Sequence, residues 1–284
     1  TEIYTLSLHD ALPILYIGDT VFTNIAQKGM YIEKLSDATI RDALFHSCGV
    51  QGGYSWPAGV DINLKFGAYA DIRVQDSTFA NCGTSHVANG AALALKARDD
   101  GATYGARPAT LDGVTVAGCV FTGNVTALRF GEPGKSNATP LNAGAHLCSI
   151  SGGLGVDNQA LAAVEAQTNW WGAATGPGPV GPGGGAGVSS NAPYSPWLGD
   201  GTNLQPDTRG FFPNLAPLYA VPTRLAFTNQ PGNGQAGLPL PAQPVVFACD
   251  ADGNVGINFA GAVGAALGAN PGGSTLGGTT PVTA

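Results

Sequence analysis

The densest group of residues that could do chemistry lies between positions 61 and 76. It holds three carboxylates and two cations, namely Asp61, Lys65, Asp71, Arg73 and Asp76. A glycoside hydrolase needs two carboxyl groups about 5 to 9.5 Å apart, and a calcium-dependent lyase needs several acidic ligands. In extended chain Asp61 and Lys65 share one face, as do Asp71 and Arg73. The set is therefore a candidate for polysaccharide cleavage, but the favoured interpretation is a group of outward-facing charges that keep the protein soluble.

Other potential ligands and nucleophiles are isolated. His86 and His146 stand in loop-like surroundings, with no neighbouring triad or metal-binding pattern. Asp250, Asp252 and Asn254 have the spacing of a calcium loop, but the distal Glu of an EF-hand is missing, so a hairpin turn is favoured. The five cysteines form no CxxC pair, and we interpret them as small buried thiols. We predict no metal and no cofactor.

The composition favours a β-rich protein with many turns. Charged residues make up only 11% of the 284 residues, while 44% are hydrophobic and 43 are glycine. Glycine costs about 1 kcal/mol in a helix interior. The net charge of −7 with only 12 Lys and Arg argues against nucleic acid and anionic membranes as partners. No apolar run reaches the roughly 18 residues of a membrane span.

A short pattern recurs between positions 15 and 172. Each copy is an apolar run that ends in Phe, and the Phe residues are 23, 34 and 42 positions apart. Asp19, Asp42 and Asp76 each stand three residues before a Phe, so we interpret them as turn or strand-start residues. Asn24 and Asn81 stand two residues after a Phe, where Asn favours a left-handed turn. The repeated residues are Phe22, Phe45, Phe79 and Phe121.

Repeats of this length are typical of solenoids, and the flanking runs alternate as half-buried strands do. We predict an all-β fold in which residues 15–172 form a right-handed parallel β-helix with Phe, Ile or Val stacked between coils. A β-sandwich with irregular loops is the alternative. The predicted strands before each Phe are Tyr16–Ile17, Thr39–Ile40, Ile72–Val74 and Val114–Val116. Those after it are Met30–Ile32, Val60–Ile62, Ala92–Leu95, Leu128–Phe130 and Leu161–Val164.

The tetrapeptide Asn169-Trp170-Trp171-Gly172 ends the repeats. We expect one or both indoles to cover the apolar end of the stack, and Gly172 to let the chain turn away. Residues 173–221 are predicted to be a Gly/Pro-rich tail and linker, with an ordered part around Trp197 that folds back on the last coil.

Residues 222–284 have a different pattern, which predicts an incomplete immunoglobulin-like (Ig-like) β-sandwich. The expected strands are Leu225–Phe227, Val245–Cys249 and Val263–Leu267, with a tight turn at Asp250–Asn254. A complete sandwich of this kind has about seven strands.

Two resemblances bear on function. The coils, the Asn-Trp-Trp-Gly motif and Ser195-Pro196-Trp197-Leu198 resemble bacterial right-handed β-helix repeat proteins of the surface or secreted class. Residues 222–284 resemble bacterial surface Ig-like repeats. Residues 1–14 resemble a translated sequencing adapter, so we treat them as an artefactual leader and leave them out of the fold.

The resemblance implies a secreted or cell-surface protein, with no signal peptide in the sequence given. We expect a non-catalytic, adhesin-like scaffold that contacts an extracellular polysaccharide or a host or matrix surface. The alternative is a polysaccharide lyase or glycoside hydrolase, because parallel β-helices also support such enzymes. The sequence leaves the ligand and the oligomeric state open.

Overall fold

The computed structural model describes residues 15–179 and 181–283, so the predicted leader lies outside the described residues. Strands make up almost all of its regular structure, and the one short helix described is α1 (Gly101–Gly105). The chain divides into two compact units, the first ending at Tyr219 and the second starting at Ala220. In the part of the chain that is described, no helix has the length and apolar character needed to cross a membrane.

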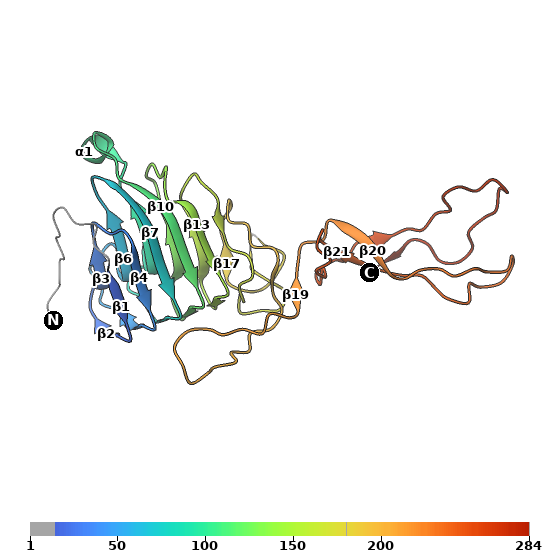
Figure 1. The fold of residues 1–284 in the computed structure, drawn as a ribbon, viewed down its shortest axis with the longest axis horizontal. Helices are drawn as coiled ribbons and strands as arrows, with labels where there is room; N and C mark the ends of the chain where they lie inside the picture. The colour runs from blue at the N-terminus through green and yellow to red at the C-terminus, as the bar shows by residue number, and fades with distance from the viewer. Residues whose placement is uncertain (1–14, 180, 284) are drawn as a thin grey trace. The chain divides into compact units, whose positions relative to one another are not determined.

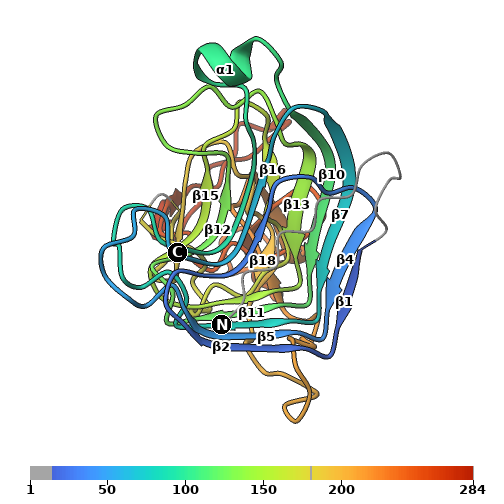
Figure 2. The same cartoon turned by 90° about the vertical axis from the view of Figure 1, so that its left-hand side faces the viewer.

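The first unit is a stack of coils whose strands form three parallel sheets, of six, five and six strands (Figure 2). This arrangement is compatible with the predicted β-helix. In sheet A the residues Ile40, Val74 and Val116 are register partners, and all three are fully buried. The strands of sheet A, which lie side by side in Figure 1, are β1 (Tyr16–Gly18), β4 (Ala38–Arg41), β7 (Ala68–Gln75), β10 (Thr110–Ala117), β13 (Leu141–His146) and β16 (Val164–Glu165).

Sheet B carries the repeated Phe residues and confirms their predicted stacking. The rings of successive Phe residues are 4.7, 4.9 and 5.0 Å apart and nearly parallel. This distance equals the spacing between neighbouring strands, so each coil places its ring directly on the next. Ile150 continues the row beside Phe121. The strands are β2 (Val21–Ile25), β5 (Leu44–Cys48), β8 (Thr78–Ala80), β11 (Val120–Thr122) and β14 (Ser149–Ile150).

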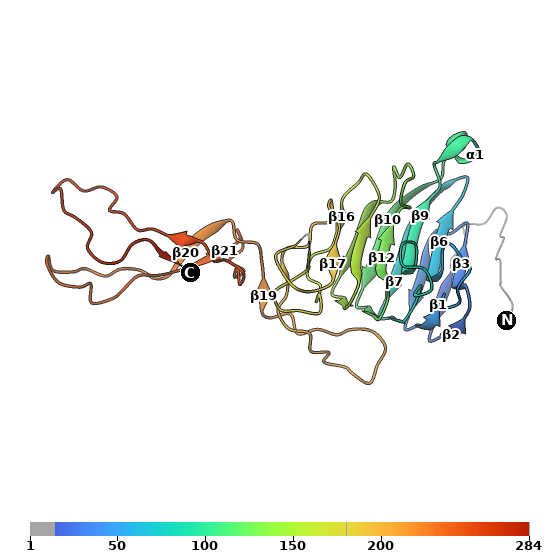
Figure 3. The ribbon, with the colours of Figure 1, turned by 180° about the vertical axis from the view of Figure 1, so that it is seen from behind.

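Sheet C is buried on both faces along its central strands β6 (Ala58–Leu64), β9 (Ala91–Ala97) and β12 (Thr126–Phe130), which lie together in Figure 3. The predicted strand at Leu161–Val164 is wrong, because β15 (Leu154–Asn158) occupies that place in sheet C and Val164 begins β16 of sheet A. The strands are β3 (Lys28–Ile32), β6 (Ala58–Leu64), β9 (Ala91–Ala97), β12 (Thr126–Phe130), β15 (Leu154–Asn158) and β17 (Gly187–Val188).

The corners of the coils explain the recurring Asp and Asn residues. These positions adopt left-handed backbone, which Asp, Asn and Gly tolerate better than most residues. The corner between sheets A and B has φ between 46° and 62° at Asp19, Asp42, Asp76, Gly118, Leu147 and Thr168. The corner between sheets B and C has φ between 53° and 66° at Asn24, Ser47, Asn81 and Gly123. Both predictions of turn residues are therefore confirmed.

Buried Asn side chains hold the stacked backbone at two coils. Asn124 accepts a hydrogen bond from the Cys82 amide at 2.7 Å and donates to the Phe79 carbonyl at 3.0 Å. Asn169 accepts from the Cys148 amide at 2.9 Å and donates to the Ala145 carbonyl at 2.7 Å. These amides satisfy backbone groups that would otherwise be buried without partners.

The Asn-Trp-Trp-Gly motif continues the stack instead of ending it. Trp170 forms a parallel bridge with Ser149, so Trp171 follows Ile150 in the row of stacked residues. Trp171 is fully buried, whereas Trp170 is partly exposed. A Cβ on Gly155 would approach Trp171 to 3.0 Å and Ile150 to 2.8 Å. The interior at β15 is thus filled by Trp171, which is why β15 has so few large apolar residues and was missed.

Residues 173–219 belong to the first unit, so the predicted boundary at Gly172 is not the end of the stack. Gly172 does turn the chain, with φ of +83°, but the chain returns as β17 beside β15. Trp197 is fully buried and donates to the Ala174 carbonyl at 2.9 Å. It lies in β18 (Trp197–Leu198), which pairs with β19 (Leu218–Tyr219).

A segment that we call the strap, residues 199–217, folds back along the corner between sheets A and B. Arg209 donates to Asp19 at 2.8 Å and to the Asp42 carbonyl. The Phe211 amide donates to the Gly118 carbonyl at 2.7 Å, and Phe211 is buried. The strap therefore joins coils that are far apart in the sequence.

The second unit consists of two small antiparallel sheets. β20 (Arg224–Asn229) pairs with β21 (Val245–Cys249), and β22 (Ala262–Val263) pairs with β23 (Val282–Thr283). The first two strands and the turn at Asp250 were predicted, and Asp250 accepts from the amides of Asp252 and Asn254 at 3.0 and 2.9 Å. The third predicted strand, Val263–Leu267, is reduced to β22. The described strands do not pack into a two-sheet sandwich of the expected size.

Candidate functional site

The five charged residues singled out in the sequence do not form one site. Asp61 lies in β6 of sheet C, and Lys65 follows that strand. Asp71 and Arg73 lie in β7 of sheet A, and Asp76 stands at the corner between sheets A and B. The coil geometry places these groups on different faces because the chain turns between β6 and β7. The constellation expected for a hydrolase or lyase is therefore wrong as a set.

Each member of the set has its own local partners. Lys65 pairs with Glu33; burial alone would lower the pKa of Lys65, but hydrogen bonds with Glu33 and Tyr31 raise it. The Asp71 carboxylate lies 3.6 Å from the Arg73 guanidinium, and both side chains are exposed to solvent. Asp76 accepts from Arg41 at 3.1 Å, and burial raises its pKa although Arg41 opposes the shift.

A different charged row is buried on the outer face of sheet C. Asp61 is 2% exposed and bonds to Lys28 at 2.6 Å, and its other oxygen lies 3.9 Å from Lys96. Lys96 bonds to Glu132 at 2.9 Å. Farther along, Arg129 bonds to Asp157 at 2.8 Å. Opposite charges alternate, as burial of ions requires.

The residues of this charged row could have been predicted from the alignment of the strands of sheet C. Asp61, Ala94 and Arg129 are successive register partners, followed by Asp157. Asp61 and Arg129 are the polar middle residues of the runs Val60–Ile62 and Leu128–Phe130. Comparing these runs across coils would have found both residues, whereas Glu132 comes from a loop whose path the sequence did not predict.

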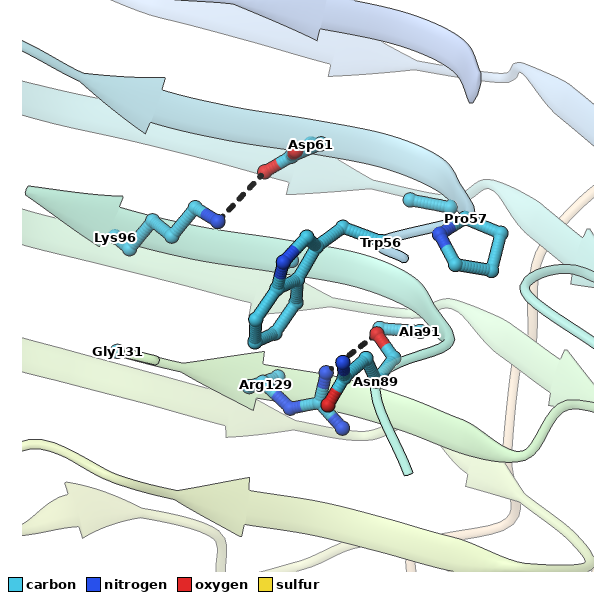
Figure 4. Close-up of a pocket in the computed structure, with 10 residues that line it drawn as sticks. Trp56, Pro57, Asp61, Asn89, Ala91, Lys96, Arg129 and Gly131 are labelled. Atoms are coloured by element: carbon cyan, nitrogen blue, oxygen red, sulfur yellow. Dashed lines mark hydrogen bonds and ion pairs between the residues drawn. The ribbon is translucent and has the colours of Figure 1, made fainter. Parts of the chain in front are cut away.

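Two loops close the charged row from outside. The indole of Trp56 lies between Lys96 and Arg129 (Figure 4), with the Lys96 ammonium 4.9 Å from its ring centre. Arg129 donates to the Asn89 carbonyl at 2.8 Å. The remaining space is about 10 Å³, enough for about one water molecule. In this closed form the row admits no sugar.

The outer face of sheet A carries an open groove instead. Its volume is about 570 Å³, and it crosses β10, β13 and β16. Small ligand sites commonly measure about 300 to 1,000 Å³. The lining residues are Val114, Thr115, Leu141, Asn142, Ala143, Gly144, His146, Ala162, Ala163 and Glu165.

A kink in sheet A shapes this groove. Asp71, Gly113 and Asn142 are neighbours across the strands, and all have positive φ, of 57°, 75° and 48°. Asn142 donates to the Asp112 carboxylate at 2.7 Å. The predicted candidate Asp71 is therefore a kink residue beside the groove.

His146 lies in the groove, at the end of a strand, and not in the loop-like surroundings that the sequence suggested. It ends β13, and its Nδ1 lies 3.1 Å from the Gln167 carbonyl. Because a carbonyl oxygen can only accept, Nδ1 carries the hydrogen. The Nε2 atom of His146 lies over Gly144. A Cβ added to Gly144 would be 2.7 Å from this Nε2 atom and 3.3 Å from the Cβ of Glu165. Gln167 also donates to Glu165 at 2.7 Å.

The cysteines are buried, as predicted, and the structure shows that they are free, which the sequence left open. Burial, together with the neighbouring Cys148 thiol, raises the pKa of Cys119 well above its ordinary value, which makes it a poor nucleophile. Among residues 15–179 and 181–283, no group of three or more His, Cys, Asp or Glu is placed to hold a metal ion.

Comparison of the chain with protein families, curated proteins and solved structures gives no significant match. Only geometry therefore distinguishes the charged row of sheet C from the groove of sheet A as a candidate binding surface. The charged row is internally paired and closed, while the sheet A groove is open and lined by hydrogen-bonding groups.

Proposed function

We propose that the chain is a non-catalytic scaffold of a secreted or cell-surface protein, with an adhesin-like function and a surface that contacts carbohydrate. The first unit would be a right-handed parallel β-helix, since parallel crossover connections are almost always right-handed. The second unit would be part of an Ig-like spacer.

One observation carries this proposal. The open groove on sheet A is lined by polar groups from three successive coils, including Thr115, His146 and Glu165. An extended polymer such as an extracellular polysaccharide, free or on a host or matrix surface, could lie across these coils. The rigid stack fixes the groups in advance, which lowers the cost of ordering on binding.

The enzyme alternative is favoured by a different observation. Asp61 and Glu132 flank Lys96 beneath Trp56, and one buried oxygen of Asp61 has no hydrogen-bond partner among the described residues. Two carboxylates and a cation could act as acid, base and charge stabiliser in a polysaccharide lyase or glycoside hydrolase. That activity requires Trp56 to move away.

A glycan array scored for both binding and product release separates the two functions. The scaffold predicts binding without new reducing ends or unsaturated products. Release of products that disappears in Lys96→Met, while Thr39→Val on sheet A cleaves normally, would establish the enzyme instead. Failure of every glycan to bind or react would overturn both.

A further inference from the structure

The loop between β9 and β10 carries α1 and projects from the corner that joins sheets C and A (Figure 2). Its base is closed by a hydrogen bond from the Ala109 amide to the Arg98 carbonyl at 2.8 Å. The Asp99 carboxylate accepts from the Ala138 amide at 2.9 Å, which joins this loop to the loop that precedes β13. The α1 loop, residues 98–109, is therefore attached to the stack at two points.

Four side chains of this corner contact one another in a row of rings and guanidinium groups, in the order Arg98, Tyr104, Phe66 and Arg107. The Arg98 guanidinium lies 4.2 Å from the centre of the Tyr104 ring, which lies 5.3 Å from the centre of the Phe66 ring. The Arg107 guanidinium lies 5.8 Å from the same Phe66 centre. These distances are those of aromatic and cation–π contacts, so the Phe66 ring positions the Arg107 guanidinium.

Phe66 is an unusual residue for its position. Its backbone is left-handed, with φ of +56°, which is a strained conformation for a bulky residue. Phe66 is also 40% exposed, so burial compensates for little of that strain. Backbone strain of this kind is concentrated at ligand sites. The ring therefore serves contacts at the surface and not the packing of the core.

Arg107 is exposed, and its guanidinium has no hydrogen-bond acceptor or carboxylate partner among the described residues. The other six arginines of the chain pair with carboxylates or donate to backbone carbonyls. Asp100 of the α1 loop is already neutralised, because Arg98 bonds to it at 2.6 Å and Lys135 lies 3.4 Å away. An oxyanion of a ligand would therefore meet a positioned guanidinium whose donors are open.

The residues around Arg107 favour one charged sugar ring over other anionic ligands. Nucleic acids and anionic membranes require clustered cations, whereas here one unpaired guanidinium adjoins one exposed aromatic side chain. A uronate or a sulfated sugar matches this pair, because it carries an oxyanion beside the apolar C–H groups of its ring. The guanidinium would bind the oxyanion through two parallel hydrogen bonds.

We infer that Arg107, supported by Phe66, is a binding site for the carboxylate or sulfate group of an acidic polysaccharide, and that the exposed surface of Phe66 contacts the sugar ring. Neither residue lines the groove of sheet A, so this second site goes beyond the proposed function and does not depend on it. It assigns the α1 loop the role of a binding loop.

The test measures binding of the full chain to three oligosaccharides of equal length: oligogalacturonate, its methyl ester, which is neutral, and a sulfated galactan. We expect an acidic sugar to bind at least about tenfold more tightly than the methyl ester. The tighter of the two acidic sugars identifies the oxyanion as carboxylate or sulfate. Arg107→Gln should weaken binding of that sugar by about tenfold or more and leave binding of the methyl ester unchanged.

Phe66→Gly tests the supporting ring. Glycine suits the left-handed backbone at this position, so the variant should fold, yet it should weaken binding of the same acidic sugar. If Phe66→Gly does not fold, the exposed Arg107→Gln variant decides alone.

Lys34→Gln is the matched control, because Lys34 is also exposed and unpaired in the described part of the chain but lies over no aromatic ring there. It changes the net charge as Arg107→Gln does and should bind all three sugars as the unaltered chain does. Equal losses in both variants would indicate a general attraction of charge and overturn the site.

Three other results would also overturn the site. One is unchanged binding of the acidic sugar by Arg107→Gln or by folded Phe66→Gly. Another is polyglutamate that binds through Arg107 as tightly as the acidic sugar, which would indicate an acidic peptide as the ligand. The third is absence of a preference for acidic sugars over the methyl ester, in which case binding of neutral glycans on the array would still preserve the proposed function.

Discussion

Asp61 shows how burial changes the value of a charge at the scale of one residue. Its side chain is 3% exposed between Lys28 and Lys96, whereas the side chain of Asp71 is 52% exposed beside Arg73. We predict that Asp61→Asn lowers the free energy of unfolding by about 3 to 5 kcal/mol, since the Lys28 ammonium loses its counterion. Asp71→Asn should change it by less than about 1 kcal/mol. Urea unfolding of the two variants measures the difference, and equal effects would contradict the assignment of the charged row.

Asp100 provides a test in acid. The Arg98 guanidinium donates to it at 2.6 Å and holds its pKa at about 2. A carboxyl whose folded pKa is depressed stabilises the fold above its unfolded value, about 3.9, and loses that stabilisation as pH falls towards 2. We predict that amides near α1 lose protection over this interval, measured as their exchange rate relative to that of an unstructured peptide at the same pH. In Asp100→Asn the protection should be low already at pH 5, and an unchanged pH profile of protection would exclude the ion pair as its cause.

At the scale of the elements, Trp171 is a packing residue in the row of stacked side chains. It is fully buried against Gly155 and Ile150. We predict that Trp171→Ala lowers the free energy of unfolding by about 3 to 5 kcal/mol. The partly exposed neighbour gives the control, because Trp170→Ala removes less buried surface and should cost less. Thermal unfolding of both variants measures this, and a smaller effect at Trp171 would argue against its place in the core.

The elements also show what sequence could predict. Stacked Phe rings and left-handed Asp and Asn corners depend on local residue types that recur in register, so both were predicted. The strand β15 was missed because its interior is filled by Trp171, which lies later in the chain. The charged row includes Glu132, which lies in a loop, and the shape of the groove depends on how the His146 ring lies over Gly144. Both features depend on contacts between different coils, and the residue pattern of a single strand does not predict such contacts.

At the scale of the whole molecule, the strap connects coils that the stack alone would couple only through neighbours. We predict that Arg209→Ala increases hydrogen exchange in β1 and β2 more than in β12, because Arg209 contacts Asp19 and Asp42. Substitution of the exposed Lys34 by Ala is the control and should leave both regions unchanged. Exchange that rises equally in all coils would indicate general destabilisation instead.

The strap also sets an order of events during synthesis. Asp19 and Arg209 are 190 positions apart, and ribosomes add about 5 to 20 residues per second. Asp19 is therefore added to the chain roughly 10 to 40 s before Arg209. During that interval its corner has only its own neighbours to hold it, so a nascent chain stalled before the strap should be cut by protease at the first coils, and one stalled after it should resist.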